Sequence, residues 1–181
     1  MPEIDGNRLF DVLMVDKRCA ALLSDTAYVQ QMLAFEAALA RAQGLAGVIP
    51  QQAADAIDRA VGAVHHDDLQ AMASAIAEGT AQAGTPVMAL VKRLTARTDL
   101  EGQPFIHWGA TTQDVMDTAL VLQWRGVLAL FDEGLLDLAS ALAALCETHR
   151  MTPMAARTVM QQALPTTFCL LYTSPSPRDR G

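Results

Sequence analysis

The sequence predicts an all-α fold, and three observations support this prediction. Of the 181 residues, 51% are hydrophobic and only 5% are aromatic, with alanine and leucine abundant. Apolar residues recur at steps of three and four, which is the spacing of one helix face. No proline occurs between Pro104 and Pro153. We expect several shorter helices followed by one long helix, and a change of character in the chain after residue 168.

The first strongly periodic helix is predicted to begin at Ser24. Serine is a favoured N-cap, and Asp25 would place a negative charge in the first turn, where the helix dipole favours it. Gly44 is predicted to end this helix as a C-cap. Apolar residues recur at steps of four, three and four along one face of this predicted helix, namely Tyr28, Met32, Phe35 and Leu39.

Three further helix starts can be predicted before residue 99. Pro50 is suited to open one helix, and Asp67 or Asp68 to cap the next, which Gly79 would stop. Thr85 followed by Pro86 has the form of an N-cap with proline at the first helical position. The inward face of that last helix is predicted to carry Leu90, Val91 and Leu94.

The longest helix is predicted from about 112 to 149, after a glycine- and proline-containing loop over 99–110. Thr111 and Asp114 have the spacing of a capping box at its start. At 1.5 Å per residue this helix would be roughly 55 Å long, which exceeds a compact domain of this size. Its apolar stripe therefore needs a bundle partner, in this chain or in another copy. The stripe comprises Val115, Ala119, Leu122, Leu130, Phe131, Leu135, Leu138, Leu142 and Leu145.

Charge and cysteine content exclude several classes of function. The formal net charge is −7 and no basic stripe is present, so we expect no nucleic-acid partner. The three cysteines, Cys19, Cys146 and Cys169, are far apart and form no CxxC pair, which argues against a disulfide framework or a zinc site. The N-terminus does not have the pattern of a signal peptide, and no apolar run approaches the roughly 20 residues that span a bilayer. We therefore expect a cytoplasmic protein without a membrane partner.

A histidine- and aspartate-rich run over 65–68 could suggest a metal site. Adjacent residues do not share a helix face, and histidines four residues apart are absent. A solvated turn with a helix cap explains the run more simply. We therefore expect no metal site at this run.

The most informative stretch is HWGATTQDVMDT, over 107–118. It places donors and acceptors at the start of the longest helix, where hydroxyls and free N–H groups can point toward one spot and bind a carboxylate or phosphate. Gly109 allows close backbone approach, and His107 can donate or carry a proton near neutral pH. On spacing alone, a capped helix start with a hydrogen-bonded histidine explains this run equally well.

A second polar run, over 157–162, could add a guanidinium and two amides to the same spot. Arginine suits a carboxylate because its fork donates two parallel hydrogen bonds. Taken alone, however, this run is better explained as an exposed turn.

These two runs resemble the signatures of the fumarase–aspartase superfamily. HWGATTQDVMDT has the H-x-G-x-T-S/T-x-D-x-x-D-T form that adenylosuccinate lyases and 3-carboxy-cis,cis-muconate cycloisomerases carry, and its Trp108 and Gln113 are closer to the cycloisomerase version. The stretch over 24–50 and the run ARTVMQQALPTTF, over 156–168, also resemble the cycloisomerases. The resemblance covers about residues 8–168.

The resemblance implies an N-terminal helical domain over 1–110 and the first part of a central long-helix bundle over 111–168, and it leaves a separate tail over 169–181. It also implies an all-α fold that forms homotetramers, with active sites built from three subunits and neither a metal nor an organic cofactor. It implies interconversion of 3-carboxy-cis,cis-muconate and a carboxymuconolactone in protocatechuate breakdown (the β-ketoadipate pathway), and hence a small polycarboxylate substrate. We predict His107 and Thr112 as catalytic residues. The predicted substrate-binding residues are Gly109, Thr111, Gln113, Asp114, Arg157, Thr158 and Gln161.

Three departures from the family pattern qualify this interpretation. Val159 stands where adenylosuccinate lyases have a catalytic histidine, which argues against an adenylosuccinate-type acid here and toward a cycloisomerase. Cycloisomerases commonly have tryptophan at this position, so the exact substrate stays open. The third signature, whose serine is the usual base, is not found, and Cys169 stands where the family has glycine. We therefore expect an N-terminal fragment, inactive alone, with a non-native or disordered tail from about 169. The rival interpretations are another lyase of the superfamily and a non-catalytic helical assembly module.

Overall fold

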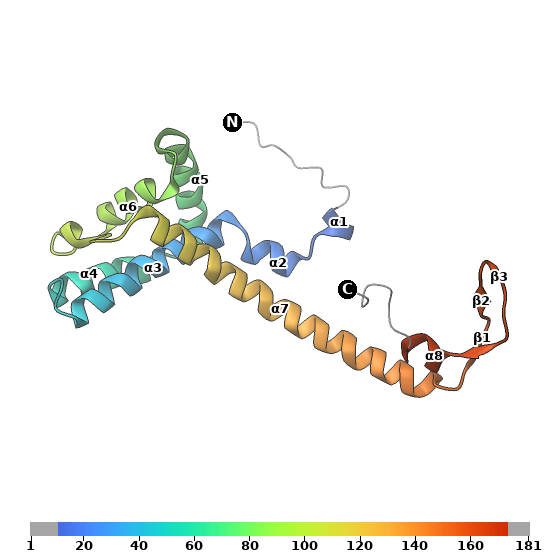
Figure 1. Cartoon of the computed structure of the whole chain (residues 1–181). Helices are drawn as coiled ribbons and strands as arrows, with labels where there is room; N and C mark the ends of the chain where they lie inside the picture. Colours follow the sequence, from blue (N-terminus) through green and yellow to red (C-terminus); the bar gives the residue numbers. More distant parts are fainter. Residues whose placement is uncertain (1–10, 174–181) are drawn as a thin grey trace. The chain divides into compact units, whose positions relative to one another are not determined.

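The computed structural model describes residues 11–173, and the chain divides into two compact units, Met1–Leu128 and Ala129–Gly181. The first unit holds the N-terminal helices (Figure 1). They are α1 (Asp11–Met14), α2 (Lys17–Leu22), α3 (Asp25–Leu45), α4 (Gln51–Gly62), α5 (His66–Ala83), α6 (Pro86–Arg97) and the short 3-10 helix η1 (Gln103–Phe105). The long helix α7 (Thr112–His149) begins in the first unit and continues into the second.

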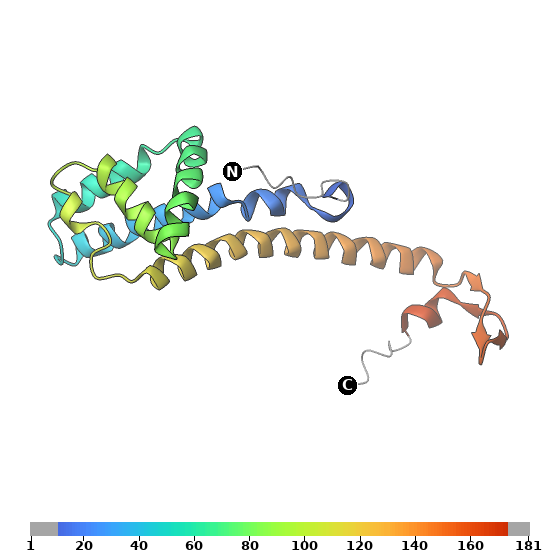
Figure 2. The ribbon, with the colours of Figure 1, turned by 90° about the horizontal axis from the view of Figure 1, so that it is seen from above.

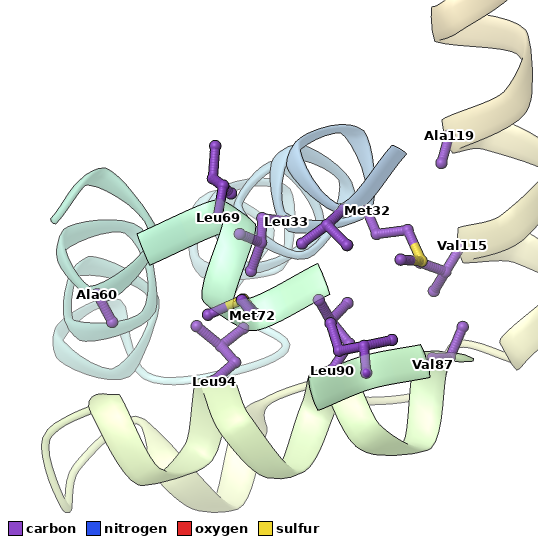
Figure 3. Packing of buried hydrophobic residues seen from close by; sticks show 12 residues of the cluster. Met32, Leu33, Ala60, Leu69, Met72, Val87, Leu90, Leu94, Val115 and Ala119 are labelled. Atoms are coloured by element: carbon purple, nitrogen blue, oxygen red, sulfur yellow. The ribbon is translucent and has the colours of Figure 1, made fainter. Parts of the chain in front are cut away.

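The core of the first unit lies between α3, α5, α6 and the start of α7. Helix α3 packs against both α4 and α5, and α5 packs against α6, as the views from the side and from above show (Figures 1 and 2). Leu90 and Leu94 of α6 are fully buried, as predicted, and Val91 packs at the edge of the core. Burial of one such leucine side chain stabilises the fold by about 1.5–3 kcal/mol. In the close view, Met32 of α3 lies beside Val115 of α7, so the core reaches the first turns of the long helix (Figure 3).

Two predicted helix starts are confirmed by their hydrogen bonds. The Ser24 hydroxyl accepts from the Ala27 N–H at 3.2 Å, and Asp25 occupies the first turn of α3. The Thr85 hydroxyl accepts from the Val87 N–H at 3.4 Å, with Pro86 at the first position of α6.

Two glycines predicted to end helices instead lie inside them. Helix α3 continues past Gly44 to Leu45, and α5 continues past Gly79 to Ala83. A Cβ atom on Gly44 would come within 2.7 Å of the Ala54 Cβ, and one on Gly79 within 2.7 Å of the Ala89 Cβ. These glycines therefore permit close approach of the next helix, and the left-handed residue that ends α5 is Gly84, with φ of 72°.

The start of α5 also differs from the prediction, because its N-cap is His65 and not an aspartate. Asp68 lies one turn inside, where its carboxylate accepts from the His65 N–H at 3.4 Å and from Arg97 at 3.1 Å. The Arg97 hydrogen bond is the main cause of the lowered pKa of Asp68. Within residues 11–173 no group of three or more histidine, cysteine or acidic side chains is placed to hold a metal ion.

Helix α7 has the predicted bounds, and its surroundings change along its length. In the first unit it buries Val115, Ala119, Gln123 and Val127, and the Gln123 amide donates to the Leu22 carbonyl at 2.8 Å. Beyond Leu128, no residue with a described side chain is buried. The predicted apolar stripe is therefore covered in the first unit only.

The second unit contains strands that the all-α prediction did not include. Each is two residues long: β1 (Pro153–Met154), β2 (Arg157–Thr158), β3 (Gln161–Gln162) and β4 (Thr166–Thr167). β1 pairs with β4 and β2 with β3, both antiparallel. The chain then forms a short helix, α8 (Phe168–Thr173), where we had expected no helix. Among residues 11–173, no helix combines the length and apolar character that a bilayer crossing requires.

Candidate functional site

The polar run over 107–118 occupies the turn between η1 and α7 and the first turns of that helix. His107 and Gly109 both have positive φ, 59° and 72°. Positive φ is uncommon for residues other than glycine, and the contacts of His107 stabilise it there. The ring of Trp108 packs against Phe105 with centroids 5.7 Å apart, and Ile106 is anchored in the core.

The contact that holds His107 is a buried carboxylate. Glu36 of α3 accepts the His107 backbone N–H at Oε2 (3.1 Å), and its Oε1 lies 2.7 Å from the His107 Nδ1. The Glu36 side chain is 1% exposed and that of His107 16%. One acidic side chain therefore fixes both the backbone and the ring of His107.

Burial of Glu36 has an electrostatic cost that His107 offsets in part. Removal from water raises the pKa of the Glu36 carboxyl, while the hydrogen bonds and charge of His107 act in the opposite direction. A carboxylate without such partners would be costly at this position. The two residues therefore form one coupled unit.

Thr111 and Asp114 form the predicted capping box. The Asp114 Oδ2 accepts from both the N–H and the hydroxyl of Thr111, each at 2.8 Å, and the Asp114 N–H donates back to the Thr111 Oγ1 at 3.3 Å. The hydrogen bond from the Thr111 N–H is the main cause of the lowered pKa of Asp114. We had expected both threonine hydroxyls to face one ligand, but the donors of Thr111 are occupied by Asp114.

Thr112 and Gln113 retain unused donors at the helix start. Within residues 11–173, neither the hydroxyl of Thr112 nor the backbone N–H groups of Thr112 and Gln113 have a hydrogen-bond partner. The Gln113 amide donates to Asp117 at 2.6 Å. The unpaired N–H groups and the helix dipole make this turn suited to an anion.

Arg157, Thr158 and Gln161 lie in the second unit, on the β2–β3 hairpin. All three are exposed, and within the described part of the chain the guanidinium of Arg157 has no hydrogen bond or ion pair. Val159 and Met160 form the hairpin turn with φ of 47° and 61°. The hairpin borders an open hollow of about 690 Å³ within this unit.

Two residues of the site were not predicted from the sequence. Glu36 anchors His107, and the Gln43 side-chain amide donates to the Trp108 carbonyl at 2.7 Å. The Gln43 oxygen is buried and has no partner among residues 11–173. A signal for Glu36 was present, because it lies four residues after Met32 on the apolar face of α3. A charged residue on a buried face needs a polar partner.

Solved structures of known enzymes share this fold. The chain superposes on a 3-carboxy-cis,cis-muconate lactonizing enzyme from Pseudomonas putida with a TM-score of 0.79 and 37% identity, over 91% of this chain and 37% of that one. It also superposes on a fumarate lyase from Mesorhizobium sp. BNC1 with a TM-score of 0.77 and 41% identity, over 84% of this chain and 35% of that one. The fold therefore belongs to the fumarase/aspartase class.

The chain belongs to the Lyase family, whose model matches residues 14–174. It is 43% identical to the 3-carboxy-cis,cis-muconate cycloisomerase of Pseudomonas aeruginosa over 93% of this chain and 36% of that protein. The chain thus spans about a third of the length of such relatives. The match also extends past 168, where we had expected the resemblance to end.

Proposed function

We propose that the residues of this chain serve a cycloisomerase that interconverts 3-carboxy-cis,cis-muconate and carboxymuconolactone. The observation that carries the proposal is the helix start at Thr112, where unpaired donors follow the anchored His107. The 43% identity to a cycloisomerase over most of the chain supports this substrate class.

The chemistry of lactone opening explains why such donors are needed. A proton is removed beside a carboxylate, the lactone oxygen leaves from the β carbon, and negative charge builds on that carboxylate. Preorganised donors stabilise this charge best where water is excluded. Thr112 and the N–H groups of Thr112 and Gln113 would supply them, with His107 as a further donor or proton carrier.

Asp114 has a different role in this proposal from direct substrate binding. Its pKa is lowered, so it is a carboxylate near neutral pH and repels an anionic ligand. Its hydrogen bonds to Thr111 instead order the helix start. Gly109 allows the backbone to approach the ligand closely.

We further propose that Arg157, Thr158 and Gln161 bind a second carboxylate of the substrate. Their exposure and the unpaired guanidinium of Arg157 support this role. We propose that they act in a homotetramer whose bundle covers the apolar stripe of α7. We also propose that domain boundaries lie near residues 110 and 168 and that residues 169–181 form a distinct tail.

The rival function is that of another lyase acting on a dicarboxylate. The 41% identity to a fumarate lyase favours it. The product distinguishes the two, because a lyase releases an unsaturated acid and a second fragment, whereas the cycloisomerase forms one isomer.

A chimaera joining residues 1–168 to the remaining two thirds of the Pseudomonas aeruginosa relative tests the proposal. We expect it to form lactone from 3-carboxy-cis,cis-muconate. Thr112→Val should lower kcat/KM by about 100-fold or more and change the free energy of unfolding by less than about 0.5 kcal/mol. Thr148→Val, at an exposed threonine of the same helix outside the 107–118 run, is the matched control.

Three results would contradict the proposal. A folded chimaera that cleaves dicarboxylates and forms no lactone would support the rival lyase. Equal losses of folding and activity in Thr112→Val would assign Thr112 to the fold. A folded chimaera with neither activity would favour the helical assembly module.

A further inference from the structure

Each oxygen of the Glu36 carboxylate faces a different donor on His107. Oε2 accepts from the backbone N–H at 3.1 Å, and Oε1 lies 2.7 Å from the ring Nδ1. The backbone N–H can only donate, so the role of Oε2 is fixed. The remaining question is where the protons of the Oε1–Nδ1 pair and of the ring Nε2 reside.

Counting protons answers this question. When the pair holds one proton, placing it between Oε1 and Nδ1 satisfies both atoms and leaves Nε2 with a lone pair. When the pair holds two, one still lies between Oε1 and Nδ1, whichever atom carries it formally, and the other is on Nε2. Glu36 and His107 therefore exchange protons with their surroundings at Nε2.

We propose that Glu36 is a positioning residue that confines proton exchange by His107 to Nε2 and fixes its neutral tautomer as Nδ1–H. Within residues 11–173 no hydrogen bond engages Nε2, whereas Nδ1 is held by a side chain that is 1% exposed. The inference that Nε2 contacts the substrate rests on the proposed function. The predicted tautomer of His107 does not depend on it.

Because proton exchange takes place at Nε2, His107 can meet a carboxylate substrate in two protonation states. With Nε2 unprotonated, the ring can accept a proton from substrate or solvent. With Nε2 protonated, it can donate a hydrogen bond to a substrate carboxylate or return that proton. Asp114 is the other acidic group whose titration His107 influences directly, and Arg97, which pairs with Asp68, makes no described contact with His107.

Glutamine at position 36 should reverse the tautomer. Its single oxygen must accept the fixed backbone N–H, so its NH₂ group faces Nδ1 and donates to it. A ring that accepts at Nδ1 carries its proton on Nε2 when neutral. The nearly isosteric Glu36→Gln substitution therefore changes a property that packing alone would not change.

Nitrogen-15 NMR of the histidine rings in the full 181-residue chain tests the inference without substrate. At the alkaline end of its titration, wild-type His107 should show a protonated Nδ1 and an unprotonated Nε2. Glu36→Gln should show the opposite pattern. Glu101→Gln, on an exposed residue, and the signals of His65, His66 and His149 are the controls.

A neutral wild-type His107 with its proton on Nε2 would overturn the inference, and this measurement does not depend on any variant folding. An unchanged tautomer in folded Glu36→Gln would also overturn it. Failure of the proposed function would give a different result, in which the tautomer is as predicted but the chimaera forms no lactone.

Discussion

The two polar runs of this chain are alike in composition but differ in what lies beneath them. The run that begins at His107 lies over the core of the first unit, where Glu36 fixes it and the capping box orders the helix start. The run that begins at Arg157 forms a two-residue hairpin in the second unit whose side chains are exposed. Both were predicted to bind carboxylates. Among the described residues, buried side chains of the same unit organise the first run but not the second.

Some side chains are oriented by their own short segment, whereas others need a buried residue beneath them. A histidine with positive φ and a defined ring orientation requires a partner that is itself immobile, and a buried glutamate on a long helix provides one. The hairpin has no such layer within the described residues of the second unit. We therefore expect substitutions in the two runs to have different consequences.

The largest expected difference concerns stability. Glu36→Ala leaves the His107 N–H and ring without their acceptor, at about 1–3 kcal/mol for each buried donor, and relief of the burial cost of the carboxylate offsets part of this. We expect a net loss of about 2–4 kcal/mol. Arg157→Ala should change the free energy of unfolding by less than about 0.5 kcal/mol. Urea denaturation followed by far-UV circular dichroism measures both, and equal losses would remove the distinction between the runs.

Backbone substitutions should have effects of opposite sign in the two runs. Gly109 has φ of 72°, so Gly109→Ala should destabilise the first unit by about 1–2 kcal/mol, although a Cβ there meets no atom within 4 Å. Met160 has φ of 61°, so Met160→Gly should relieve strain and stabilise the hairpin by up to about 1 kcal/mol. Amide hydrogen exchange of residues 105–117 and 153–167 reports each effect locally. Destabilisation of the hairpin by Met160→Gly would show that its turn is held by contacts and not by strain.

The smallest expected effect is the pH dependence of the capping box. The folded-state pKa of Asp114 lies below its ordinary value of 3.8, so its contribution to stability is complete above about that pH. It is lost as the pH falls through the folded-state pKa. The Tm of Asp114→Asn should therefore lie below that of wild type near neutral pH and converge with it in acid. Asp67→Asn, in the first turn of α5, is the control, and a difference that persists in acid would mean that the charge of Asp114 is not responsible.

Much of the fold could be predicted because it depends on local rules. The cap at Ser24, the Thr85-Pro86 start and the bounds of α7 follow from hydrogen-bonding side chains and apolar spacing within a few residues. The prediction that helices end at Gly44 and Gly79 was wrong. In sequence, a glycine that allows a neighbouring helix to approach cannot be distinguished from one that ends a helix. That distinction depends on tertiary packing.

The candidate site, like the fold, could be predicted only where it depends on residues close together in the sequence. The capping box of Thr111 and Asp114 is local and was predicted. The link from His107 to Glu36 spans 71 residues, so no short motif contains it, and only the misplaced charge on the face of α3 hints at it. The occupation of the Thr111 donors by Asp114 could not be predicted either, because the same spacing also permits a ligand to bind both threonines.

The most direct test of the central claim is a titration of the 181-residue chain with 3-carboxy-cis,cis-muconate, observed by nitrogen-15 NMR. The account predicts saturable shifts at the Thr112 and Gln113 N–H groups and at the His107 Nε2, with the Thr112 response lost in Thr112→Val. Absence of any saturable shift at these atoms would contradict the claim that the start of α7 is a carboxylate site.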